Sequence, residues 1–175
     1  MSAKVIRAHD PRWQDAYRQE AGQIERAFGD CLDGIDHIGG TSIAGIFAKP
    51  VIDILVQARS LAEVEARSPA MMDLGYEARG EYGLPGRRYF SRKVSAASVT
   101  GYHVHVYQSG SADAFRHLAF RDFLVLHPQL ADAYSELKRS LADSSGVLPP
   151  DYANLKSAFV QDIERQALAH FRRTR

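Results

Sequence analysis

The sequence predicts an α+β fold, in which helices flank a mixed and largely antiparallel sheet. Two apolar runs, Ile35 to Ile38 and Val51 to Val56, have the length and composition of buried strands. Three more candidate strands lie close together in the middle of the chain, at residues 76–79, 88–94 and 102–107. Because short glycine- or serine-rich turns join these three, we expect neighbouring strands to run antiparallel.

Helices account for most of the remaining chain. Apolar residues from Trp13 to Phe28 keep helical spacing, and Gly29 ends that segment. Ser60 and Glu63 have the spacing of a capping box, which predicts the start of a second helix. Further helices are expected at residues 112–127, 128–142 and about 151–172, with a short strand at 4–7 and a loop at 144–150.

The composition is that of an ordinary globular protein. Hydrophobic residues make up 45% of the chain and charged residues 25%, and 175 residues are the usual length of a single domain. The formal net charge of +1 gives no support for a general nucleic-acid binder. Cys31 is the only cysteine, which excludes an internal disulfide and a cysteine-rich zinc site.

Neither a targeting segment nor a membrane segment is recognised in the sequence. The first ten residues lack the apolar stretch of a signal peptide, and no apolar run approaches about 20 residues. We therefore expect a cytoplasmic protein that does not interact with a membrane.

The first chemically informative segment is the turn Gly39-Gly40-Thr41-Ser42 between two predicted strands. Adjacent glycines permit positive φ angles and leave room for a ligand to approach the backbone. The hydroxyls of Thr41 and Ser42, next to backbone N–H groups at a helix start, are suited to an anion, and Lys49 adds a positive charge. The alternative is a tight turn with a purely structural role.

Asp53 is the one charged residue in the apolar strand that follows. Burying an unpaired carboxylate is unfavourable by several kcal/mol, so Asp53 needs a partner. A phosphate-compatible turn followed by a lone carboxylate indicates a phosphorylated ligand, with or without a metal ion. The alternative is an internal ion pair between Asp53 and a lysine or arginine.

His103 and His105 form the second informative pair. Side chains alternate along a strand, so these two imidazoles share one face and can meet one metal ion or one anionic group. For a metal, imidazole ligands favour zinc, manganese or iron over magnesium. The alternative is a polar sheet face in which each histidine is hydrogen-bonded to a neighbour.

Basic residues elsewhere are candidates for contacting phosphate. Arg88 and Arg92 have even spacing and therefore share a face in a regular strand, and a guanidinium fork matches the geometry of phosphate. Arg121 is another candidate, with an ion pair to Asp122 as its alternative. Three residues on the later helices could line the same cleft, although each is more simply explained as structural or solvated: Lys138, Tyr152 and Lys156.

Together and in this order, these segments resemble the GrpB family (UPF0157). The resemblance covers nearly the whole chain and rests on HIGGTSIAGIFAKPVIDILV, Arg88-Tyr89, His103-x-His105, FRDFL at residues 120–124, and Tyr152 with Lys156. The family comprises small bacterial and occasional eukaryotic proteins, sometimes fused to dephospho-CoA kinase. It is similar to the polymerase-β-like nucleotidyltransferase superfamily, which implies a mixed sheet flanked by helices.

The resemblance also implies roles for individual residues. The turn from Gly39 to Ser42 matches the superfamily turn that holds the triphosphate of an incoming nucleotide, and Asp53 matches the first of the strand carboxylates that hold magnesium. The second acid, expected two residues later, is replaced by Leu55, and the strand of the third acid corresponds to that of His103 and His105. These histidines and Asp53 are therefore the predicted catalytic and metal-binding residues, for magnesium, manganese or zinc.

Two functions remain open at this point. The first is a metal-dependent nucleotidyltransferase, in which the turn and Arg88 hold phosphate, Asp53 holds the metal, and a histidine completes the coordination or acts as a base. The second is a catalytically silent module that binds a nucleotide or a phosphorylated metabolite. Two-metal phosphoryl chemistry needs a dense set of oxygen ligands, so the missing acids favour the second function, whereas Asp53 beside two histidines favours the first.

Overall fold

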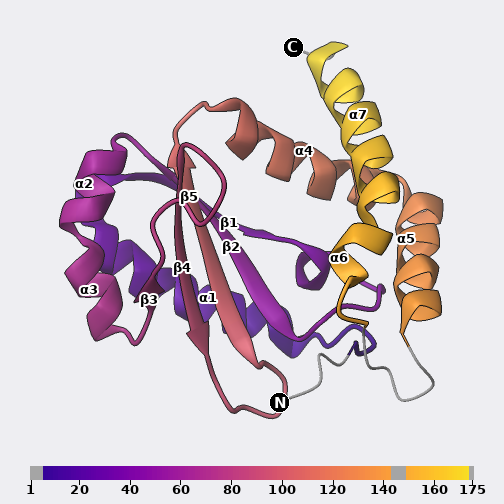
Figure 1. The fold of residues 1–175 in the computed structure, drawn as a ribbon, viewed down its shortest axis with the longest axis horizontal. Coiled ribbons are helices and arrows are strands. Elements are labelled where there is room, and N and C mark those ends of the chain that lie inside the picture. Colours follow the sequence, from indigo (N-terminus) through magenta and orange to yellow (C-terminus); the bar gives the residue numbers. More distant parts are fainter. Residues whose placement is uncertain (1–5, 143–148, 174–175) are drawn as a thin grey trace.

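The computed structural model describes residues 6–142 and 149–173 and contains the expected sheet (Figure 1). Its strands are β1 (Leu32–Ile38), β2 (Val51–Ala58), β3 (Glu77–Ala78), β4 (Arg87–Lys93) and β5 (Gly101–Gln108). They lie in the order β1-β2-β5-β4-β3, in which β2 and β5 are parallel and the other neighbouring pairs are antiparallel. The prediction of a mixed, largely antiparallel sheet is confirmed.

The pairing of β2 with β5 brings distant parts of the chain side by side. Asp53 is paired with His103 and Leu55 with His105, while Ile38 of β1 is paired with Asp53 on its other side. Because side chains alternate along each strand, Asp53 and both histidines project from the same face of the sheet. The predicted shared face of the two histidines is confirmed, and Asp53 joins them on it.

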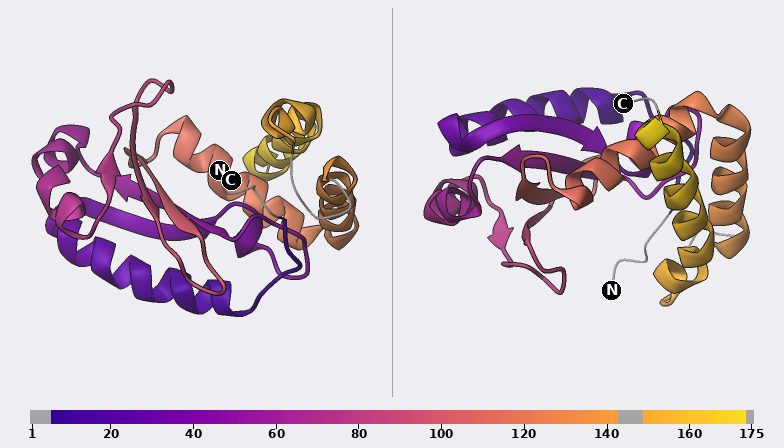
Figure 2. Two further views of the ribbon diagram at one scale, coloured as in Figure 1. Left: turned by 60° about the horizontal axis from the view of Figure 1, so that its bottom comes forward. Right: turned by 90° about the horizontal axis from the view of Figure 1, so that it is seen from above.

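One face of the sheet is covered by α1 (Arg12–Phe28), α2 (Leu61–Ala66) and α3 (Ser68–Asp73) (Figure 1, Figure 2). Trp13 and Phe28 of α1 belong to the same buried cluster as Ile52, Phe90 and Val104 of the sheet. This cluster is the main hydrophobic core, and burial of its apolar surface is the principal force that holds α1 to the sheet.

The opposite face carries α4 (Ala112–Leu126), which leads to a helical layer at one end of the sheet (Figure 1). We use the name helical layer for α5 (Pro128–Leu141), α6 (Tyr152–Leu155) and α7 (Ser157–Arg173). With α4 the layer forms a second buried cluster, which includes Ile46, Phe123, Tyr134 and Ile163. The helices expected at 112–127 and 128–142 are confirmed, whereas the last helix expected is divided at Lys156 into α6 and α7.

Two short 3₁₀ turns, η1 (Gly29–Cys31) and η2 (Gly40–Ser42), flank β1. Of the strand expected at 4–7, Arg7 pairs with Ala48 in an isolated bridge, and residues 4 and 5 lie outside the described residues. Most of the loop expected at 144–150 also lies outside them. Within residues 6–142 and 149–173, no helix is long and apolar enough to cross a membrane.

Candidate functional site

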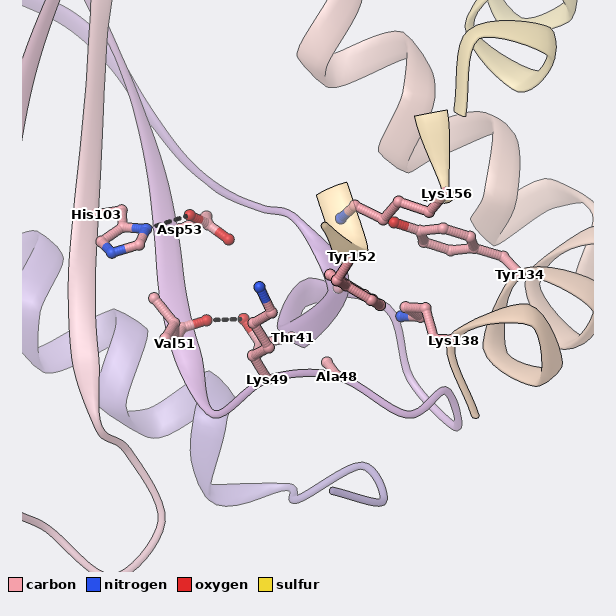
Figure 3. Close-up of a pocket in the computed structure, with 11 residues that line it drawn as sticks. Thr41, Ala48, Lys49, Val51, Asp53, His103, Tyr134, Lys138, Tyr152 and Lys156 are labelled. Carbon is pink, nitrogen blue, oxygen red and sulfur yellow. Dashed lines mark hydrogen bonds and ion pairs between the residues drawn. The ribbon is translucent and has the colours of Figure 1, made fainter. Parts of the chain in front are cut away.

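A cavity of about 170 Å³ lies between the starts of β2 and β5 and the helical layer (Figure 3). What we call the sheet wall consists of Gly40, Thr41, Val51, Asp53 and His103. What we call the helix wall consists of Tyr134, Lys138, Tyr152 and Lys156, and Ala48 and Lys49 complete the lining. The cavity therefore brings together the predicted turn, the lone strand carboxylate and one of the two histidines.

Asp53 is the acidic centre of the sheet wall. His103 Nδ1 and His105 Nε2 each lie 3.4 Å from Asp53 Oδ1, and the side chain of Asp53 is 29% exposed. Burial alone raises the pKa of Asp53, but the two histidines outweigh burial and hold that pKa below its ordinary value. Asp53 is therefore a carboxylate at neutral pH, with the histidines on one of its oxygens.

Two further rings surround this cluster. The ring of Tyr89 lies 5.7 Å from that of His103 and 5.2 Å from that of His105, and His117 of α4 lies 5.6 Å from His105. Burial, together with the nearby charge of Arg116, lowers the pKa of His117 to about 3, so this imidazole is neutral at pH 7. No pattern in the sequence points to a role for His117, because its position beside His105 depends on how α4 packs against the sheet.

The two glycines of the turn make close contacts within the chain possible. Gly39 has φ 72° and ψ −173°, and a Cβ atom at this position would lie 2.5 Å from Asp53 Oδ2. A Cβ atom on Gly40 would lie 3.2 Å from Lys138 Nζ and 3.0 Å from Ala48 Cβ. The glycine pair therefore lets η2 lie directly against Asp53 and Lys138, on both sides of the cavity.

The hydroxyls of Thr41 and Ser42 were expected to donate to an anion, but both donate to backbone carbonyls of the chain. Thr41 donates its proton to the carbonyl of Val51 at 3.1 Å and accepts a hydrogen bond from His37 Nε2 at 2.9 Å. Ser42 donates its proton to the carbonyl of Gly39 at 2.6 Å. Both hydroxyl protons are used within the fold, because nearby carbonyls compete for them.

Lysines dominate the other side of the cavity. Lys138 is 3% exposed, its ammonium lies 4.3 Å from the centre of the Tyr134 ring, and its Nζ has no hydrogen-bond partner in the described part of the chain. Burial, and then the charge of Lys156, lower the pKa of Lys138 to about 7. Burial also lowers the pKa of Lys156, while Asp53 raises it. Lys49 and Lys156 lie 4.6 Å and 5.0 Å from the centre of the Tyr152 ring.

Tyr134 is a cavity residue that the sequence argument missed. A signal for it exists, because the segments predicted to be helical twice place a tyrosine four residues before a lysine: Tyr134 with Lys138, and Tyr152 with Lys156. On a helix this spacing puts the two side chains on the same face. Both tyrosines are largely buried, and burial raises the pKa of each hydroxyl, so both remain protonated at neutral pH.

Arg88 and Arg121 are not brought to the cavity. Arg88 and Arg92 do share a face of β4, but it is the face of the main core, where Arg88 Nε lies 2.6 Å from Glu65 Oε1. Arg121 forms ion pairs with Asp122 at 2.7 Å and with Asp36 at 3.2 Å, and the first is the ion pair given above as its alternative role. The even spacing in β4 predicted a common face correctly but could not say which face of the sheet it is.

The predicted metal ligands form a hydrogen-bonded cluster. Among the described residues, no group of three or more histidine, cysteine, aspartate or glutamate side chains is arranged to hold a metal ion. Both histidines approach the same oxygen of Asp53, and one carboxylate with two imidazoles is a donor set that suits zinc or manganese better than magnesium.

Comparison with known proteins identifies relatives over most of the chain. The sequence model of the family described as GrpB protein matches residues 4–166. The chain is 35% identical over 159 residues to the UPF0157 protein YqkA of Bacillus subtilis, covering 91% of this chain but 46% of YqkA. The crystal structure of the conserved protein GrpB from Enterococcus faecalis aligns with a TM-score of 0.84 at 33% identity, covering 95% of this chain and 99% of that one. A structure of Cid1 with the UTP analogue UMPNPP aligns with a TM-score of 0.47 at 6% identity, covering 85% of this chain and 48% of Cid1.

Proposed function

This chain belongs to the GrpB family, and on that premise we propose that it binds a nucleotide or another phosphorylated small molecule in the cavity. The observation that carries this proposal is the ammonium of Lys138, which is buried at the cavity without a hydrogen-bond partner in the described structure. A buried amine of this kind is unfavourable unless a ligand supplies acceptors. Phosphate oxygens are strong acceptors for it.

The distribution of charge gives the ligand an orientation. Lys138 and Lys156 repel each other across the helix wall, and an anion between them would remove that repulsion. Asp53 on the sheet wall repels a phosphate, so the phosphate end lies toward the lysines. Hydrogen-bond donors of the ligand, such as hydroxyls, then lie toward Asp53.

A nucleotidyltransferase is the second candidate function, and the position of Asp53 favours it. This carboxylate is ionised, partly exposed, and opposite the proposed phosphate position (Figure 3). In this role Asp53 would hold a divalent metal with His103 or His105, and the metal would supply charge neutralisation of the phosphate. A histidine not bound to the metal would accept the proton of the attacking hydroxyl. Without metal binding and proton transfer, the same residues would form a site that binds the ligand and catalyses no reaction.

Thermal unfolding with ligands tests both functions. We would add inorganic phosphate, pyrophosphate, ATP, UTP and coenzyme A precursors, each alone and with magnesium, manganese or zinc. A ligand at about 100 times its Kd stabilises the native state by about 2.7 kcal/mol, which for a chain of this length raises Tm by roughly 5–10 °C. The shift should be lost in Lys156→Ala and kept in Lys93→Ala, which removes an exposed lysine of β4.

The role of metal separates the two candidates. Stabilisation that requires a metal and is lost in Asp53→Asn, accompanied by release of pyrophosphate from a nucleoside triphosphate, supports the transferase. Stabilisation that is independent of metal and unchanged in Asp53→Asn supports the binding module. Absence of any shift with every phosphate compound, or equal loss in Lys93→Ala, would overturn the proposal that this cavity binds phosphate.

A further inference from the structure

The positively charged residues that line the cavity are lysines, although arginine is much more frequent in this chain. It contains five lysines and seventeen arginines, yet three of the lysines line the cavity (Lys49, Lys138 and Lys156), and none of the described arginines does. Arginine matches phosphate better, since its fork binds two oxygens at once. Lysine differs in one chemical respect, because a buried lysine can lose its proton and arginine cannot. The cavity therefore uses the one cation that can also be a neutral amine.

Lys138 has the surroundings of such an amine. Its Nζ is buried against the Tyr134 ring, and in the part of the chain that the structure describes no carboxylate forms an ion pair with it. The charged group that acts on it from the helix wall is Lys156, which, together with burial, lowers the pKa of Lys138 to about 7. The absence of a side chain at Gly40 keeps the space beside Nζ open, because a Cβ there would lie 3.2 Å away.

We propose that Lys138 is a covalent amine site, whose Nζ forms an imine with the aldehyde or ketone carbonyl of a small phosphorylated compound. The proposal rests on the proposed function. As an ammonium Lys138 donates to the phosphate together with Lys156, and once it has lost its proton Lys156 and Lys49 keep the phosphate while the Lys138 amine reacts. A buried lysine amine beside a second cationic group is an established way to activate this nucleophile, and Lys138 is buried with Lys156 as that group.

The reaction balances without an oxidant, a reductant or another reactant. The nitrogen lone pair of Lys138 attacks the carbonyl carbon and forms a C–N bond, which gives a carbinolamine. The carbinolamine oxygen then leaves as water with the two hydrogens that Nζ carried, and a C=N bond remains. The protonated hydroxyl of Tyr134 points into the cavity and can donate to the departing oxygen (Figure 3).

Pyridoxal 5′-phosphate is a suitable probe, because it carries both a phosphate and an aldehyde. The full chain is incubated with it at pH 7, reduced with sodium borohydride, digested, and mapped by mass spectrometry. We expect the adduct at Lys138 to exceed that at the exposed Lys93 by about tenfold or more, because a much larger fraction of Lys138 is the free amine. Lys138→Arg keeps the charge but removes the amine, so the adduct should disappear. Lys138→Met is the second variant should the arginine disturb folding.

Two phosphate-matched controls separate this proposal from the proposed function. Pyridoxine 5′-phosphate has no aldehyde, and it should bind, raise Tm and protect Lys138 from labelling. Pyridoxal has no phosphate, and it should label Lys138 at least several-fold less in the wild type. Glycolaldehyde phosphate repeats the labelling with a smaller compound.

The outcomes are distinct. Binding of pyridoxine 5′-phosphate without an adduct at Lys138, or labelling that is equal at Lys138 and Lys93, overturns the imine and leaves the phosphate cavity standing. Failure of every phosphate compound to bind overturns both. An adduct at Lys138 that is lost on addition of pyridoxine 5′-phosphate supports both.

Discussion

Replacing Lys138 with methionine should stabilise the protein when no ligand is present. The pKa of this amine falls from 10.5 to about 7 on folding, and at about 1.36 kcal/mol per pH unit this opposes folding by about 4 kcal/mol at pH 7. Methionine fills a similar volume without a charge, but it loses the cation–π contact with Tyr134, worth about 1–2 kcal/mol. We therefore expect a net gain of about 2 kcal/mol, or roughly 4–8 °C in Tm.

The pH dependence makes this prediction specific. The native state releases the proton of Lys138 above about pH 7, whereas the unfolded state keeps it until about pH 10.5, so wild-type stability rises with pH between these values. The advantage of Lys138→Met should accordingly shrink by about 2 kcal/mol between pH 7 and pH 9. Urea unfolding in a phosphate-free buffer measures both values, with Lys93→Met as an exposed control that should change stability by less than about 0.5 kcal/mol. An advantage of Lys138→Met that does not shrink with pH, or a loss of stability at pH 7, would show that the buried Lys138 amine does not destabilise the native state.

Three further perturbations test other parts of the structure. Gly39→Ala should lower the free energy of unfolding by about 2–4 kcal/mol in urea, because φ is +72° and the new Cβ would clash with Asp53. Gly45→Ala is the control: φ is +82° there, but the space is open, so only backbone strain should lower its stability. Equal losses in the two variants would contradict the clash with Asp53. Wild-type stability should fall by up to about 3 kcal/mol from pH 6.5 to pH 4, because burial holds the pKa of His37 near 4 in the native state while the unfolded chain takes up the proton. His37→Gln should make stability depend less on pH in this range. An unchanged pH dependence in His37→Gln would contradict this role of His37. Arg88→Ala should leave the Tm shift caused by phosphate ligands unchanged. Loss of that Tm shift in the variant would show that Arg88 takes part in binding the ligand.

Local signals in the sequence were sufficient for most of the secondary structure. The helix start predicted at Ser60 is present, with the Ser60 hydroxyl capping the helix by accepting a hydrogen bond from the backbone N–H of Glu63 at 3.4 Å. Strand alternation placed His103 and His105 on one face because it depends only on neighbours in the chain. The last helix was predicted without its break at Lys156, since no proline or glycine marks that position.

The candidate site was harder to predict because it depends on long-range pairing. Asp53 meets the two histidines through the parallel register of β2 with β5, which no local pattern determines. The burial of Lys138 was not predicted for a related reason, since it results from the packing of the helical layer. A single lysine in a helix is usually expected to be exposed to solvent. The spacing of Arg88 and Arg92 predicted that they share one face of the strand. Which face of the sheet that is depends on the pairing of β4 with β5, which turns it toward the main core.

The two walls of the cavity are held mainly by different buried clusters: the sheet packs in the main core, and α5 and α7 pack in the second cluster with α4. A molecule that bridges Asp53 and Lys138 therefore acts as a tether between two bodies. Its binding energy should appear as slowed amide exchange in α5 and α7, whose attachment to the rest of the protein it strengthens, more than in β2, which the core already protects. How far apart the walls stand is then set by the occupant as well as by the protein.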